Sequence, residues 1–175
     1  MKFIDLLTLA YNEIDEVDED EQIEIIVKAG INEAYSILCN KDIRLNRAYV
    51  PVINGIAELP EDFVTMVKCI PPLTDERVVG KFILSGEEEV EGGTYEVVYA
   101  YAREELKNDN DEPDLHITLQ FALVQYACYK YFLHRKKVEV AMAFYRNYEA
   151  YVFKFESENV GSCKVERIQF VDLME

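Results

Sequence analysis

The spacing of apolar residues changes twice along this chain, and that change constrains the fold more than any other feature. Up to about residue 40, apolar residues recur every three or four positions, as on one face of a helix. Between residues 46 and 103 short runs of strand-forming residues are separated by turn signals, and from residue 114 the helical spacing returns. We therefore predict an α+β fold with an N-terminal helical pair (residues 3–40), a small, mostly antiparallel β-sheet (46–103) and a C-terminal helical hairpin (114–157).

The central region carries specific turn signals. Asn54-Gly55 predicts a tight hairpin, because both turn residues need a positive φ. Pro51 cannot donate to a ladder, so we expect its strand to lie at a sheet edge or to be bulged. Pro60 to Phe63 predicts one helical turn or a tight loop. Further strands are expected over Val64–Ile70, Val78–Leu84 and Thr94–Ala102.

The helical regions also predict details. Gly30 lies inside the second expected helix, where glycine costs up to about 1 kcal/mol relative to alanine, so it indicates close packing. The short basic connection His134–Lys137 predicts two antiparallel late helices. We expect that hairpin to pack on the sheet, within one domain over residues 1–158. Residues 159–175 alternate apolar and polar residues near their end and are expected to form an extended C-terminal arm.

The charge of the chain argues against a phosphate-binding role. There are 34 acidic and 18 basic residues, a net charge of −16, whereas nucleic-acid-binding domains are basic. The acids concentrate in the segment Asp15–Glu21, DEVDEDE. A calcium loop needs oxygen ligands at alternate positions and a central glycine, but Val17 stands at the third position and the next glycine is Gly30. We therefore favour a solvated turn over a calcium site.

The search for catalytic and metal-binding patterns gives no candidate site. We find no nucleophile elbow, P-loop or dinucleotide fingerprint, and the four scattered cysteines are expected to be reduced thiols. His116 and His134 are expected at opposite ends of one helix, too far apart to share a metal. Asp109 and Asp111 could ligate a metal, but a linker that ends in a helix start is the favoured interpretation. We expect no enzymatic activity, no cofactor, no bound metal and no membrane span.

Tyrosine is the most unusual part of the composition, with twelve residues in the chain. Two interpretations stay open: the tyrosines fill a core with their hydroxyls at its margin, or they form a subunit interface, where tyrosine is enriched. Both late helices offer more apolar surface than one small domain needs, which favours subunit contacts. The candidate interface residues are Tyr126, Tyr129, Tyr145, Tyr148 and Tyr151.

Two stretches carry a family resemblance. Ile53–Phe63, INGIAELPEDF, and the Ala- and Tyr-containing hairpin Leu115–Phe155 resemble the head–tail connector (adaptor) proteins of tailed bacteriophages. The resemblance implies a structural virion protein that forms a ring, usually twelve-fold, between the portal protein and downstream tail or neck proteins. DNA would pass through the ring without sequence-specific binding.

The resemblance also implies a location and a portal-binding segment. The protein would lie at the head–tail junction of the virion and in the host cytoplasm during assembly. Family members commonly grip the portal with a C-terminal extension, which here would be the arm. Its candidate portal-binding residues are Val165, Ile168, Phe170, Val171 and Leu173.

Two other functions are weighed against the connector. An acidic DNA mimic would occupy the groove of a basic partner, and the acidic residues 1–40, with a net charge of −8, would suit it. An enzyme would need converging residues with perturbed pKa values in a pocket, and the residue spacings do not support one.

Overall fold

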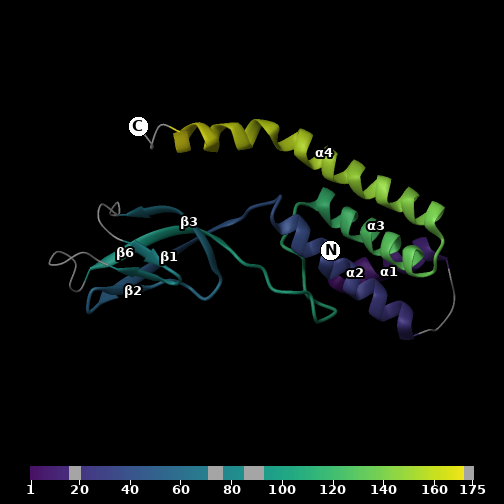
Figure 1. Cartoon of the computed structure of the whole chain (residues 1–175), viewed down its shortest axis with the longest axis horizontal. Coiled ribbons are helices and arrows are strands. Elements are labelled where there is room, and N and C mark those ends of the chain that lie inside the picture. The colour runs from purple at the N-terminus through teal and green to yellow at the C-terminus, as the bar shows by residue number, and fades with distance from the viewer. Residues whose placement is uncertain (16–20, 71–76, 85–92, 172–175) are drawn as a thin grey trace. The chain divides into compact units, whose positions relative to one another are not determined.

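The computed structural model describes residues 1–15, 21–70, 77–84 and 93–171, and it confirms the predicted α+β class (Figure 1). Four helices and six strands lie in these ranges. Their order is α1 (Phe3–Ile14), α2 (Glu21–Cys39), β1 (Leu45–Ile53), β2 (Ile56–Glu58), β3 (Phe63–Ile70), β4 (Arg77–Val79), β5 (Phe82–Leu84), β6 (Thr94–Tyr101), α3 (Ile117–His134) and α4 (Val138–Val171). Most of the acidic segment Asp15–Glu21 lies outside the described residues.

The chain divides into two compact units. A helical unit combines Met1–Asp42 with Glu105–Glu175, and a β unit comprises Ile43–Glu104. The boundaries between the units lie close to the two positions at which the spacing of apolar residues changes. Both boundaries lie inside residues 1–158, which the sequence predicts as one domain. Each unit has its own hydrophobic core. The helical hairpin, expected to pack on the sheet, is grouped with α1 and α2 instead.

Helix α3 is the central element of the helical unit. It packs against α1, α2 and α4, and its residues from Ala122 to Cys128 are all buried. Leu6, Ile31 and Leu123, one from each of three helices, are fully buried in the shared core. Most apolar side chains of α3 are therefore covered within the chain, whereas Ile117, Phe121 and Leu133 stay at least 40% exposed.

Gly30 allows the close approach of α2 to α3 that its position in the sequence predicts. A Cβ placed there would lie 3.0 Å from the Cα of Ala127 and 3.4 Å from its Cβ. Real Cβ contacts are rarely that short, so the absence of a side chain lets the two helices meet.

The β unit is one antiparallel sheet with strand order β3-β6-β1-β2-β5-β4. Along β6, Tyr95, Val97 and Tyr99 are buried, and the residues between them are half-buried. The opposite side chains of β1 and β5 complete the core with Val50, Val52 and Ile83. Both faces of β6 are therefore covered at least in part.

Two tight turns shape this sheet. Asn54 and Gly55 have φ values of 53° and 74°, and Ile53 pairs with Ile56 across them, which confirms the predicted hairpin. The single strand predicted over Val78–Leu84 is wrong. Gly80, with φ of 60°, turns the chain there, so that β4 and β5 pair with each other.

Pro51 lies in an interior strand, which corrects the expected edge. β1 pairs with β6 over Leu45–Pro51, but its pairing with β2 starts only at Val52. At Pro51, β1 is therefore paired only with β6. The missing N–H of the proline does not remove a hydrogen bond to β2.

The loops at the expected linkers are turns with internal hydrogen bonds. The Phe63 N–H donates to the Pro60 carbonyl at 3.0 Å, which forms the predicted tight turn. The Asp111 carboxylate accepts the N–H groups of Asn108 and Lys107, and these bonds lower its pKa. The Asp111 carbonyl in turn accepts the Phe3 N–H at 2.7 Å, at the start of α1.

The C-terminal segment differs from the expected extended arm, because α4 continues as a helix to Val171. The alternation of Arg167, Ile168, Gln169 and Phe170 covers too few residues to separate a strand from a helix. Continuing a helix that is already formed costs less than nucleating a new element. The last residues of the arm, including Leu173, lie outside the described residues.

Candidate assembly surfaces

The five candidate tyrosines lie together along the α3–α4 hairpin. Tyr126 and Tyr129 come from α3, whereas Tyr145, Tyr148 and Tyr151 come from α4. Ring centroids lie 5.1 Å apart for Tyr126–Tyr148 and 5.0 Å apart for Tyr129–Tyr145. Such spacings are typical of favourable aromatic pairs. The tyrosines therefore first stabilise the hairpin itself.

Their burial separates the five tyrosines into two groups. Tyr126 and Tyr148 are buried, whereas Tyr129, Tyr145 and Tyr151 are half-buried. Desolvation raises the pKa of Tyr148, with further contributions from the neighbouring Tyr145 phenol and two glutamates. The raised pKa keeps the Tyr148 hydroxyl protonated at neutral pH. Only the three half-buried rings retain surface that a partner could cover.

A polar contact joins the tyrosine cluster to α2. The Tyr126 hydroxyl donates to the Glu33 carboxylate at 2.7 Å, and the Lys130 ammonium lies 2.8 Å from the same carboxylate. The hydrogen bond from Lys130 and then the one from Tyr126 lower the pKa of Glu33, while burial and the nearby carboxylate raise the pKa of Tyr126. The hydrogen bond and the ion pair therefore connect α2 to α3.

One face of the β unit exposes large apolar side chains. In the register of the sheet, Ile53 of β1 pairs with Ile56 of β2, which pairs with Leu84 of β5. Directly paired residues share a face, so these three form a continuous exposed row. We call the whole surface the outer sheet face. Its members are Tyr49, Ile53, Ile56, Ile70, Val79, Phe82 and Leu84.

The outer sheet face also carries charged side chains. On it, the Glu96 carboxylate forms an ion pair with the Arg47 guanidinium at 2.7 Å, beside Tyr49. A paired acid adds little net charge to the surface. An exposed apolar face of this kind is a candidate contact surface.

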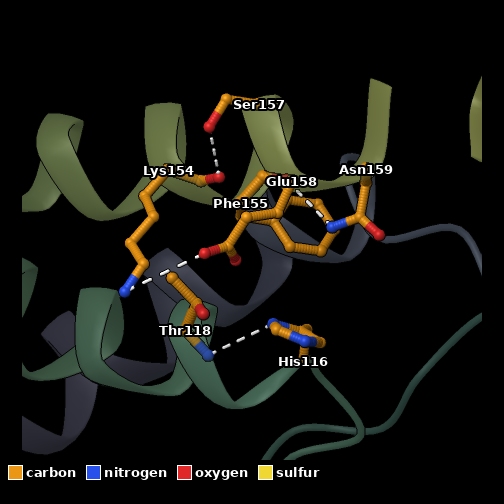
Figure 2. Close-up of polar contacts among 7 residues, drawn as sticks. All are labelled: His116, Thr118, Lys154, Phe155, Ser157, Glu158 and Asn159. Carbon is orange, nitrogen blue, oxygen red and sulfur yellow. Dashed lines mark hydrogen bonds and ion pairs between the residues drawn. The ribbon is translucent and has the colours of Figure 1, made fainter. Parts of the chain in front are cut away.

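Helix α4 passes the start of α3 near Phe155. The buried Phe155 ring lies 5.5 Å from the His116 ring, and His116 caps α3 by accepting the Thr118 N–H (Figure 2). Beyond this point, the Asn159 amide donates to the Phe155 carbonyl at 2.9 Å, within α4 itself. The helix then runs to Val171, so about 24 Å of it lies past the N-terminus of α3 at 1.5 Å per residue.

An open groove of about 440 Å³ follows the hairpin on the side of α1. We call it the hairpin groove. It is lined by Glu13, Gln125, Asn147, Ala150, Tyr151 and Lys154. Among these residues, the Asn147 amide donates to the Gln125 side-chain oxygen at 3.0 Å, and the Tyr151 ring stacks on Phe121 with the ring centroids 5.9 Å apart.

The described residues show no further site of other kinds. Within them, no three His, Cys, Asp or Glu side chains come together as metal ligands. His116 and His134 stand at the two ends of α3, as predicted. Burial, with a smaller effect of Glu13, raises the pKa of the Cys128 thiol to about 12, so it is a poor nucleophile. None of the helices that the structure describes is long and apolar enough to cross a membrane.

Comparison with known proteins does not extend this picture. No family model matches the chain, and no curated protein matches it.

Sequence reasoning missed the outer sheet face and the hairpin groove. The signal for the first was present, because Ile53 and Ile56 flank a two-residue turn and Phe82 and Leu84 alternate with the buried Ile83. The groove could not be found in this way, since its lining combines Glu13 of α1 with residues of α3 and α4 more than a hundred positions later.

Proposed function

We propose that this chain is a subunit of a ring-shaped head–tail connector, a structural protein rather than an enzyme. The outer sheet face carries the proposal. It presents exposed apolar side chains in paired rows, in a chain whose acidity keeps other surfaces apart. A ring needs one face of a subunit to contact a different face of the next. The outer sheet face would supply one of the two.

The sequence resemblance supports the same function. Within Ile53–Phe63 lie the Asn54-Gly55 hairpin and the Pro60–Phe63 turn, so the resembling residues are also the ones that shape the sheet. The ring would contact the portal protein on one side and tail or neck proteins on the other. Carboxylates facing the channel would repel phosphate, so that DNA could slide without binding.

Self-association tests the proposal directly. We expect sedimentation velocity of the purified chain, measured over a range of concentrations, to show assembly into one closed species. Ile53→Glu should weaken that assembly by about tenfold or more, because it places a charge on the outer sheet face. Ile25→Glu is the matched control, because both isoleucines are 66% exposed but Ile25 belongs to α2 of the helical unit. Equal effects of the two variants would count against this surface.

Electron microscopy of purified virus particles tests the location. Antibody labelling of this chain should mark the junction between head and tail. A chain that stays monomeric even in the presence of the portal and tail proteins, or that is missing from the junction, would contradict the connector function. Salt-sensitive binding to a basic partner instead would favour the DNA-mimic alternative.

A further inference from the structure

We propose that Asn54 is a modification site, at which the folded chain converts the side-chain amide into a carboxylate without an enzyme. The reaction is deamidation, and its nucleophile is the backbone nitrogen of the next residue, Gly55. The chemistry at Asn54 is independent of the proposed ring function. Its effect on assembly rests on that function, because Asn54 adjoins the outer sheet face.

The reaction needs only water and hydroxide as further reactants. Hydroxide removes the proton of the Gly55 amide, and the nitrogen then forms a bond to Cγ of Asn54. The side-chain nitrogen takes up a proton and leaves as ammonia, which gives a cyclic imide. Water opens this ring at one of its two carbonyl groups, so the product is either aspartate or isoaspartate. No electrons are transferred, and the chain gains one negative charge.

The sequence singles out this asparagine. Asn54 is the only asparagine in the chain that is followed by glycine. Every other residue type except glycine carries a Cβ next to the attacking nitrogen, and that Cβ hinders ring closure. A Cβ placed at Gly55 would meet no atom within 4 Å, so the space beside this nitrogen is open on the folded chain as well.

The turn between β1 and β2 leaves both reacting groups accessible. The Asn54 side chain is exposed, and no hydrogen bond to it is found among the described residues. The ladder of this hairpin closes with the pair Ile53 and Ile56. Within the part of the chain that the structure describes, the Gly55 N–H donates no turn or loop hydrogen bond. Neither group therefore has to leave a protein partner before it reacts.

The product changes the outer sheet face. Ile53 and Ile56, on either side of the turn, are 66% and 44% exposed and belong to that face. Deamidation places a carboxylate between them, whereas charged residues are depleted at the centres of protein interfaces. Aspartate followed by glycine still favours a two-residue turn, but isoaspartate adds one CH2 to the backbone of that turn. We therefore expect modified subunits to associate less well.

Peptide mass spectrometry of the purified full chain tests the site. During incubation at neutral and at mildly alkaline pH, the peptide that contains Asn54 should gain the mass difference between NH2 and OH. The modified fraction should grow with time, and its rate should rise in proportion to the hydroxide concentration. Asn12 is the internal control, because it is also exposed but is followed by Glu13, and it should stay unmodified.

A variant and a peptide complete the test. Asn54→Gly removes the reactive amide and keeps a residue that favours the same turn, so it should abolish the mass change at this position. A synthetic peptide of residues 45–62 gives the rate without the folded sheet. Modification of the peptide but not of the folded chain would overturn the proposal, because the hairpin would then prevent the reaction. Equal rates at Asn54 and Asn12 would also overturn it.

Sedimentation velocity of the same incubated samples measures the effect on assembly. The incubated natural chain should lose assembly as its modified fraction grows, whereas incubated Asn54→Gly should keep it. Full modification with unchanged assembly would contradict the expected effect on the outer sheet face. A fresh chain that never associates would overturn the ring function, and the mass measurement would still decide whether Asn54 is modified.

Discussion

At the scale of single residues, the contact of Glu33 with Tyr126 and Lys130 is the clearest electrostatic element in the helical unit. Glu33 is on α2 and its two partners are on α3, so their contact bridges helices that otherwise meet through apolar side chains. Because the carboxylate is partly exposed, solvent screens the pair, and its contribution to stability is modest.

This contact predicts a pH-dependent stability. The folded-state pKa of Glu33 is lowered, first by the Lys130 hydrogen bond. Its stabilisation is therefore complete above the ordinary glutamate pKa of about 4.3 and is lost as the pH falls through the lowered value. Glu33→Gln should reduce the free energy of unfolding by about 0.5 kcal/mol at neutral pH. Urea unfolding at successive pH values should show this difference shrinking as the pH falls below the ordinary glutamate pKa of about 4.3; a constant difference would argue against the contact.

Gly30 gives a second prediction at this scale. Gly30→Ala gains helix propensity but forces a Cβ to within 3.0 Å of the Ala127 Cα, so α2 and α3 must move apart. Overpacking costs about 1–3 kcal/mol and exceeds the propensity gain of about 1 kcal/mol. We expect net destabilisation in chemical unfolding. Ser36→Ala, at an exposed position on the same helix, is the control and should stabilise slightly. Stabilisation by both variants would show that the helices can adjust.

At the scale of elements, the turns determine how the sheet is built. Gly55 and Gly80 have φ values of 74° and 60°, and a Cβ at either would meet no atom within 4 Å. The cost of a side chain there is therefore one of backbone conformation alone. Gly55→Ala and Gly80→Ala should each lower the free energy of unfolding by about 1 kcal/mol, and asparagine at either position should cost less. Urea unfolding compares the four variants, and equal costs for alanine and asparagine would be against this explanation.

The elements also show what local sequence can and cannot predict. The helical pair, the Asn54-Gly55 hairpin and the α3–α4 connection follow from short-range patterns and were predicted correctly. The β4–β5 turn at Gly80 was missed because a lone glycine in an apolar run is compatible with both a strand and a turn. The helical end of α4 was missed because the alternation there covers only a few residues. The tyrosine contacts across α3 and α4 depend on the hairpin register, which local patterns leave open.

At the scale of the whole molecule, two separate cores mean that the two units need not lose structure together. The β unit is inserted between residues 42 and 105 of the helical unit, and each unit buries its own apolar residues. The free energy of unfolding of such a protein is best measured for each unit separately, because a single unfolding transition does not describe two units that can unfold independently.

Matched substitutions in the two cores test this independence. Leu123 of α3 and Ile83 of β5 are both fully buried, so replacing either by alanine should cost about 2–5 kcal/mol. Under native conditions, hydrogen exchange measured by mass spectrometry should rise mainly in α1–α3 for Leu123→Ala and mainly in the strands for Ile83→Ala. Because each variant is the other's control, the pattern does not depend on the absolute stability. Equal loss of protection in both units from either substitution would mean that they fold as one cooperative body, and the outer sheet face would then be a part of that body rather than the surface of a separable module.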